Sequence, residues 1–264
     1  MIKNILKKIL PKPIIKLLKQ FKYCSFNNLK KSKQKHRTII KNPNLKELKK
    51  IYNNTWKNNS IPLKQLKITE KELPNFINNT NMKFCVALIK KTNLKTPNLL
   101  EIGCSTGYFS EIFKRTGIKG KYEGCDYSKE FIKIAKQKYS NIPFTINDAT
   151  KLNYENKKFD IVISGCCLLH IINYQKAISE AVRVSKEFVI FYRTPILHLK
   201  KTIFTKKIGY DLEMLEILFN ENELIDLFLK NGLLIQSVKT HSRSFIKEIN
   251  EPVFVKSYLC KKIK

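Results

Sequence analysis

From about residue 75 onward, short apolar runs alternate with stretches whose apolar residues recur at helical spacing. The apolar runs predict buried strands at residues 99–102, 122–125, 142–146, 159–163 and 188–192. The helically spaced stretches predict helices at residues 84–90, 109–114, 131–139 and 174–184. Such alternation is typical of a doubly wound, mostly parallel sheet with helices on both faces.

The last part of the chain predicts one more helix and two more strands. Asn220 precedes the helical stretch, with Glu223 three residues on, which is the spacing of a capping box, and Gly232 follows its end. Residues 233–238 and 253–259 have the pattern of strands, and no helix separates them. We therefore expect an antiparallel hairpin at one edge of a seven-stranded α/β sheet that spans residues 75–264.

Residues 1–74 have a different pattern and are interpreted as a basic, helical amino-terminal extension. Residues 2–10 place apolar side chains on one side of a helix and lysines on the other, and residues 14–21 repeat this after two prolines. Residues 26–74 are rich in Lys, Asn and Pro and predict loops and short helices. The amphipathic helices could bind an anionic membrane surface through residues 1–22, or the protein's own core, or a partner subunit.

The positive charge of the chain is concentrated in this extension. The formal net charge is +30, and residues 1–50 hold fifteen Lys and one Arg against one acid, Glu47. A basic arm of this kind favours lipid head groups or nucleic acid. The competing explanation is codon bias in an AT-rich genome, which enriches lysine everywhere.

Cysteine usage and hydropathy bear on the compartment. The seven cysteines include no C-x-x-C pair, and several fall within apolar runs, which indicates reduced core thiols. No apolar stretch is long enough to span a bilayer, and the lysine-interrupted amino terminus does not resemble a signal peptide. We expect a cytoplasmic protein, with peripheral contact at the inner face of the membrane as an option.

A glycine-rich turn follows the first predicted strand, in the run Glu101-Ile102-Gly103-Cys104-Ser105-Thr106-Gly107. Glycine is needed where a backbone turns sharply or approaches a ligand closely, although either glycine alone could serve any α/β turn. The run matches neither the dinucleotide fingerprint G-x-G-x-x-G nor a phosphate-binding loop. A ligand without phosphates is therefore favoured.

This motif, together with residues at the ends of the next strands, resembles the class I S-adenosylmethionine-dependent methyltransferases, whose fold is Rossmann-like. The resemblance implies that S-adenosylmethionine binds at the carboxyl ends of the strands. Asp126 would bind the ribose hydroxyls, Tyr127 would pack on the adenine, and Asp148 with Ala149 would meet the adenine amino group. The cofactor-binding residues expected from the resemblance are Glu101, Gly103, Cys104, Gly107, Asp126, Tyr127, Asp148, Ala149, Ser164 and Gly165.

Each of these residues also has a structural explanation. Asp126 could cap the helix that follows it, and Asp148 could cap a turn. Their order along the chain supports the functional interpretation, because every piece follows a strand, where open α/β sheets bind ligands.

Two groups of residues are candidates for catalysis and acceptor binding. His170, just past the fourth strand, could act as a general base, although a packed structural role is favoured. Residues 193–216 leave the fifth strand at the cofactor edge, and Arg193, His198, Tyr210 and Glu213 are the candidate acceptor-binding residues there. The Asn/Asp-Pro-Pro-aromatic motif of amino methylation is absent, which argues against nucleobase amino chemistry.

The leading hypothesis is a methyltransferase acting on an oxygen or nitrogen atom of a small molecule, with a sugar or cell-envelope precursor as one candidate. An RNA methyltransferase that uses the basic arm is the alternative, and a non-catalytic cofactor-binding protein is the third. No metal is expected.

Overall fold

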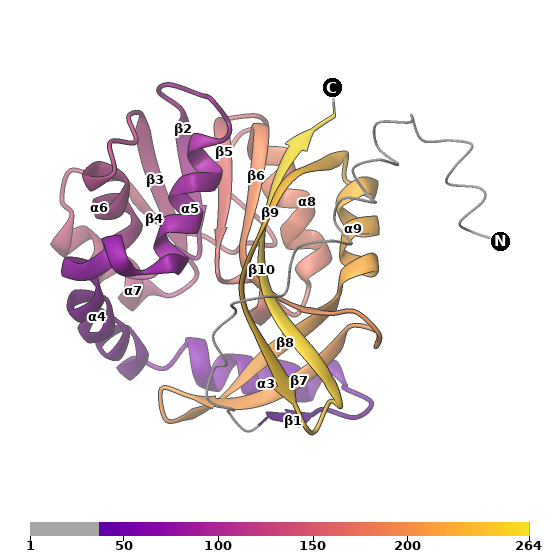
Figure 1. Cartoon of the computed structure of the whole chain (residues 1–264). Helices are drawn as coiled ribbons and strands as arrows, with labels where there is room; N and C mark the ends of the chain where they lie inside the picture. The colour runs from indigo at the N-terminus through magenta and orange to yellow at the C-terminus, as the bar shows by residue number, and fades with distance from the viewer. Residues whose placement is uncertain (1–36, 264) are drawn as a thin grey trace, which may run out of the picture. The chain divides into compact units, whose positions relative to one another are not determined.

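Five parallel strands form the centre of the sheet in the computed structural model, which describes residues 37–263. They are β2 (Asn98–Ile102), β3 (Lys121–Asp126), β4 (Phe144–Ile146), β5 (Phe159–Gly165) and β6 (Ser185–Leu197). Their order across the sheet is β4-β3-β2-β5-β6 (Figure 1). Successive strands are added toward one edge of the sheet from β2 to β4 and toward the other edge from β5 to β6. The switch point thus lies between β2 and β5, where a crevice opens at the carboxyl ends of the strands.

Helices cover both faces of these strands, as the alternating pattern predicts. The flanking helices are α5 (Thr80–Lys90), α6 (Tyr108–Arg115), α7 (Lys129–Lys138), α8 (Tyr174–Val184) and α9 (Glu221–Lys230). Side chains alternate across a strand, so Leu99 packs in the core with α5 and α6, whereas Leu100 packs in the core with α8 and α9. The side chain of Asn220 accepts hydrogen bonds from the first turn of α9, so the predicted cap is confirmed.

The carboxyl-terminal strands form the expected antiparallel hairpin. β9 (Leu233–Ile246) and β10 (Glu251–Lys262) pair with each other, and β10 also pairs antiparallel with β6. The order β4-β3-β2-β5-β6-β10-β9 is the seven-stranded, mostly parallel sheet that the sequence predicts. The fold class is therefore confirmed.

Three further antiparallel strands were not expected from the sequence. β1 (Arg37–Ile39), β7 (Ile203–Gly209) and β8 (Leu212–Asn220) pair in the order β1-β7-β8, and the end of β8 runs beside the end of β6. Residues 193–216, interpreted from the sequence as a polar insertion, are thus mostly strand. Their lysines and glutamates obscure the apolar alternation, and β6 itself runs on to Leu197.

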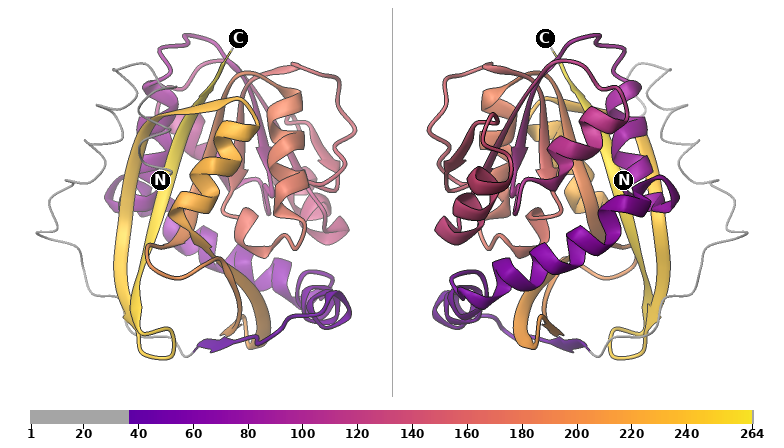
Figure 2. Two further views of the ribbon diagram at one scale, coloured as in Figure 1. Left: turned by 90° about the vertical axis from the view of Figure 1, so that its right-hand side faces the viewer. Right: turned by 90° about the vertical axis from the view of Figure 1, so that its left-hand side faces the viewer.

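Two helices precede the central sheet, with the 3-10 helix η1 (Leu73–Asn78) after them. α3 (Leu45–Trp56) packs on β8, and α4 (Ser60–Glu72) has contacts with α7. Figure 2 shows α3 running across one end of the parallel strands, next to the β7–β8 hairpin. Residues 45–72 therefore form longer helices than the sequence pattern predicted.

The predicted amphipathic helices at residues 2–10 and 14–21, and the membrane contact through residues 1–22, lie outside the described residues. Within residues 37–263, every helix is too short or too polar to span a lipid bilayer. The boundary between an extension (residues 1–74) and a methyltransferase domain (residues 75–264) stays a prediction.

Candidate functional site

A cavity of about 700 Å³ opens at the carboxyl ends of the parallel strands. One half is lined by the ends of β2, β3 and β5 and by the turns that follow them, and we call it the strand-end half. The other half is lined by residues of α3, α4, β7, β8 and the end of β6, and we call it the hairpin half. The two halves are parts of one continuous space, so two molecules bound there could meet.

The two glycines of the first motif have different roles. Gly103 lines the cavity with φ +73°, and a Cβ atom there would lie 2.5 Å from the Cβ of Cys167. Gly107, with φ +77°, is the N-cap of α6, and a Cβ atom there would lie 2.5 Å from the Phe144 ring. Gly107 and the buried Cys104 do not line the cavity. Close packing against Phe144 and the positive φ therefore both favour glycine at position 107.

The carboxyl group of Glu101 is buried at the end of β2 and reaches the cavity wall. Burial raises its pKa to about 8, although the hydrogen bond from the Tyr122 hydroxyl, at 2.5 Å, acts in the opposite direction. Glu101 is therefore mostly protonated at neutral pH. A Cβ atom on Gly165 would lie 2.5 Å from Oε1 of Glu101, so glycine at the end of β5 makes room for this carboxyl group.

Asp126, at the end of β3, connects the first motif to the next turn. Its carboxylate accepts hydrogen bonds from the backbone N–H of Ser105 at 2.9 Å and of Ser128 at 3.0 Å. Burial raises its pKa, while these backbone donors oppose the rise. Each carboxylate oxygen accepts more than one hydrogen bond, so Asp126 can still accept from a ligand in the cavity that it lines.

Tyr127 lies beside an aromatic residue that sequence reasoning missed. The ring of Tyr52, from α3, lies 5.8 Å from the ring of Tyr127, and both line the cavity. Burial raises the pKa of Tyr52, and Tyr127, Asp126 and Asp148 add to the rise, so its hydroxyl lies near the strand-end half. Tyr52 and Trp56 are one helical turn apart, a spacing that could have suggested a shared face.

The remaining strand-end candidates divide between the cavity and the core. Asp148 and Ala149 line the cavity, but Oδ1 of Asp148 accepts hydrogen bonds from the backbone and the hydroxyl of Thr150, both at 2.8 Å. The turn-capping explanation thus accounts for one oxygen of Asp148. Ser164 is buried, and its hydroxyl oxygen lies 3.3 Å from the sulfur of Cys167. Ser164 does not line the cavity, whereas the next residue, Gly165, does.

His170, in the short 3-10 helix η2 (Leu168–His170), lines the cavity between the two halves. Its Nδ1 lies 2.6 Å from the carbonyl oxygen of Leu215, and its ring lies 4.7 Å from the ring of Trp56. Because a carbonyl oxygen only accepts, Nδ1 carries the hydrogen and Nε2 keeps a lone pair. Burial and the nearby Lys207 charge lower its pKa to about 4. His170 is thus a neutral hydrogen-bond acceptor and a weak base at neutral pH.

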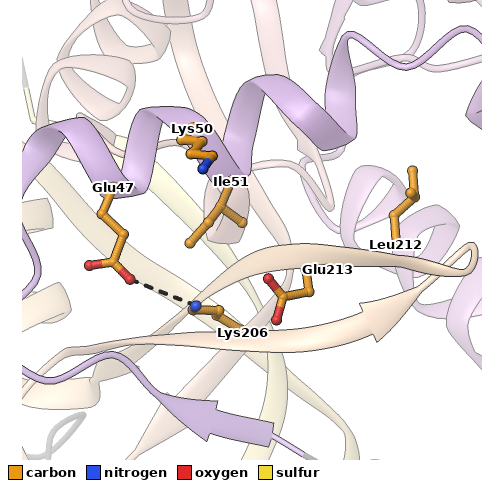
Figure 3. Close-up of a pocket in the computed structure, with 6 residues that line it drawn as sticks. All are labelled: Glu47, Lys50, Ile51, Lys206, Leu212 and Glu213. Carbon is orange, nitrogen blue, oxygen red and sulfur yellow. Dashed lines mark ion pairs between the residues drawn. The ribbon is translucent and has the colours of Figure 1, made fainter.

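The four acceptor-binding candidates do not all come together. Arg193 and Tyr210 line the hairpin half of the cavity. His198 lies elsewhere, with Nε2 2.9 Å from Glu221 and its ring stacked on Phe254. Glu213 lines a second, smaller cavity of about 370 Å³ between α3 and the β7–β8 hairpin, where an ion pair joins Glu47 to Lys206 (Figure 3).

The strand-end half has the features that a nucleoside ligand requires. The Asp126 carboxylate offers acceptors to hydroxyl groups, and Tyr127 and Tyr52 offer aromatic faces. The buried hydroxyl of Ser105 has no hydrogen-bond partner among the described residues and also lines this half. These donors and acceptors fit S-adenosylmethionine, and residues 37–263 contain no group of His, Cys, Asp and Glu that could hold a metal ion.

Residues 100–192 match the family model described as a methyltransferase domain. The chain is 26% identical over 112 residues to a demethylmenaquinone methyltransferase of Paenarthrobacter aurescens, covering 41% of this chain and 44% of that protein. It is 30% identical over 104 residues to a ubiquinone/menaquinone biosynthesis C-methyltransferase of Campylobacter jejuni, covering 38% of this chain and 43% of that protein. The matched region thus spans less than half of each relative.

Solved structures share the fold over most of the chain. The 1,6-didemethyltoxoflavin-N1-methyltransferase of Burkholderia thailandensis gives a TM-score of 0.58 at 12% identity, covering 88% of this chain and 97% of that chain. The magnesium protoporphyrin IX methyltransferase of Synechocystis PCC 6803 gives 0.56 at 15% identity, covering 84% and 100%. The strand order, the motif residues at the strand ends and the family match lead to one conclusion: residues 100–192 belong to a methyltransferase domain, and the chain has the fold of the class I S-adenosylmethionine-dependent methyltransferases.

Proposed function

We propose that the protein transfers a methyl group from S-adenosylmethionine to an oxygen or nitrogen atom of a small molecule held in the hairpin half of the cavity. The observation that carries this proposal is the continuity of the cavity from Asp126 to the wall formed by α3 and β7–β8. A methyl transfer needs the two molecules end to end in one enclosed space, because positioning supplies most of the rate enhancement.

The strand-end half would hold the cofactor. Asp126 would accept hydrogen bonds from the ribose hydroxyls, Tyr127 and Tyr52 would pack beside the adenine, and the Gly103 turn would lie against the remainder. When bound, S-adenosylmethionine supplies a methyl group on a sulfonium centre, which is a good leaving group. The protein therefore needs chiefly to orient the acceptor and to exclude water.

His170 is the candidate residue for orienting the methyl acceptor. Its Nε2 can accept a hydrogen bond from an acceptor hydroxyl or amine, which would orient the reacting lone pair. The low pKa means that His170 holds a proton poorly at neutral pH, so we propose a positioning role for it and not that of a strong base.

Two classes of acceptor atom are considered, carbon on the one hand and oxygen or nitrogen on the other. The relative from Campylobacter is named as a C-methyltransferase, while the fold neighbour from Burkholderia is named as an N1-methyltransferase. We favour oxygen or nitrogen, with a sugar or cell-envelope precursor as one candidate acceptor. The carbon-13 chemical shift of the transferred methyl group, measured by NMR on a product made with labelled S-adenosylmethionine, would distinguish carbon from oxygen or nitrogen.

Calorimetric titration with S-adenosylmethionine tests the cofactor proposal. The wild type should bind, and Asp126→Ala should weaken binding by about tenfold or more, as expected for lost hydrogen bonds to a charged group. Tyr52→Ala should weaken binding as well, since its ring lies beside Tyr127. Asp226→Ala is the matched control, because it removes an exposed carboxylate on α9 outside the cavity. A wild type that ignores the cofactor at millimolar concentration would refute the proposal.

RNA methylation is the second candidate, since the basic residues 1–50 could bind a phosphate backbone. RNA affinity that falls steeply with salt, without affinity for anionic vesicles, would favour it. Binding of S-adenosylmethionine without turnover on any acceptor would instead favour a non-catalytic role.

A further inference from the structure

Arg193 lines the hairpin half of the cavity, and no side chain of residues 37–263 pairs with its guanidinium group. Among residues 37–263, its side chain takes part in no hydrogen bond or ion pair, and its Nε is buried and unsatisfied. Only its backbone is bonded: its N–H donates to the hydroxyl of Ser257 and its carbonyl accepts from the Cys166 thiol. Arginine stays protonated in proteins, so Arg193 is a largely buried cation that forms no ion pair with a carboxylate of residues 37–263.

The backbone of β6 is distorted at the same residue. Tyr192 and Arg193 together face Ser257 of β10, so β6 contains one extra residue, a β-bulge. Arg193 has φ +55°, a left-handed backbone conformation that is unfavourable for residues other than glycine. Bulges of this kind redirect a side chain and are enriched next to active sites. The bulge therefore directs the Arg193 side chain toward the cavity wall, and β6 continues beyond it to Leu197.

The distortion is held in place by neighbouring residues. The hydroxyl of Ser257, which accepts from the Arg193 N–H at 2.9 Å, also lies 2.7 Å from Nε2 of His241. Nδ1 of His241 lies 2.8 Å from Oδ1 of Asn81 on α5. This chain of hydrogen bonds connects the bulge to β9 and α5, so the position of Arg193 is built into the fold.

A second unsatisfied donor lines the same cavity. The indole Nε1 of Trp56 is buried and has no hydrogen-bond partner among the described residues. Both unsatisfied groups, Trp56 Nε1 and Arg193 Nε, are N–H donors, so the missing partner must offer acceptor atoms. A ligand oxygen would satisfy either group, because a buried donor without a partner is costly.

The remaining charges of the hairpin half are already paired. Glu216 pairs with Arg37 and Lys207, and Asp211 pairs with Lys64. These ion pairs use both acids of this half and leave Arg193 as the cation without a carboxylate partner in the described chain. Apolar and aromatic side chains, Ile68, Met214 and Tyr210, line the same half. The hairpin half thus combines one available positive charge with an apolar wall.

We propose that the methyl acceptor is an anionic small molecule with an apolar body, whose carboxylate or phosphate group binds the guanidinium of Arg193. A planar guanidinium can donate two parallel hydrogen bonds to either oxyanion. The apolar body would lie beside Tyr210 and Met214. This inference rests on the proposed function, because it names the class of acceptor for the same cavity.

Binding of simple probes to the protein saturated with S-adenosylhomocysteine tests the inference. Calorimetric titrations would compare benzoate and phenyl phosphate with neutral benzyl alcohol, for the wild type, Arg193→Gln and Arg193→Lys. We expect at least one of the two anions to bind the wild type more tightly than benzyl alcohol does. The anion that binds more tightly shows whether the acceptor's anionic group is a carboxylate or a phosphate. Arg193→Gln should weaken anion binding by about tenfold or more, and Arg193→Lys should weaken it less.

The matched control is Arg115→Gln, which removes a guanidinium from the surface of α6, where it pairs with Glu111 outside the cavity. It should bind the anions as the wild type does. Anions that bind Arg193→Gln as tightly as the wild type, or no more tightly than benzyl alcohol, would overturn the inference. The comparison of charged and neutral probes on the wild type does not depend on the folding of any variant. A wild type that does not bind S-adenosylhomocysteine would refute the proposed function instead.

Discussion

Nδ1 of His170 lies 2.6 Å from the carbonyl oxygen of Leu215, and this contact connects the 3-10 helix after β5 to strand β8. The hydrogen on Nδ1 fixes the tautomer of the ring and leaves Nε2 as a hydrogen-bond acceptor. The same contact connects the central sheet to the β1-β7-β8 strands, so His170 both packs against the hairpin and lines the cavity.

The buried His170 should make stability depend on pH. Its pKa is about 4 in the folded chain, against an ordinary value of 6.5, so between these pH values the unfolded chain binds more protons. The His170 contribution is complete above pH 6.5 and is lost as pH falls toward 4, with an upper bound of about 3 kcal/mol. Urea denaturation at several pH values would measure the free-energy difference between wild type and His170→Gln. This difference should narrow as the pH falls, and a constant difference would contradict the prediction.

The contact between Gly103 and Cys167 can be separated from backbone strain. Gly103→Ala and Gly117→Ala both place a side chain at positive φ, +73° and +69°, but only the first meets another atom within 4 Å. Each variant should lose about 1 kcal/mol of stability from the conformation. Gly103→Ala should lose more and should also bind S-adenosylmethionine more weakly, because Gly103 lines the cavity. Equal Tm values and equal cofactor affinities for the two variants would show that the close contact is unimportant.

The buried ion pairs of Glu216 should contribute more than an exposed pair. Burial alone would raise the pKa of Glu216, but the charges of Lys207 and Arg37 lower it to about 2. Glu216→Gln leaves both cations without a carboxylate and should cost about 3 kcal/mol at pH 7. Glu47→Gln, which breaks the more exposed pair with Lys206, should cost less than about 1 kcal/mol.

The acid dependence of the same variants gives a second measurement. Because the folded pKa lies below the ordinary 4.5, the contribution of Glu216 is present above pH 4.5 and is lost as pH falls toward 2. Chemical denaturation should therefore show the gap between wild type and Glu216→Gln closing in this range. A gap that persists at pH 2 would mean that the charge of Glu216 is not what stabilises the wall.

Local patterns in the sequence determined the central sheet and the half of the site that lies on it. The apolar runs predicted seven strands, and the motif residues Gly103, Asp126 and Gly165 follow three of them, so their meeting at one edge follows from the parallel order. Glycine-rich turns and strand periodicity depend on neighbouring residues, which is why the sequence alone predicts them.

Tertiary structure alone decided the hairpin half. Glu216 pairs with Arg37 across 179 positions of the chain, and the Arg193 side chain is directed by a bulge that depends on Ser257, 64 positions later. No local pattern encodes such pairings, because strand register and cavity walls arise when distant segments pack together. The sequence by itself thus predicted the residues of the strand-end half, while the fold decided which side chains line the hairpin half.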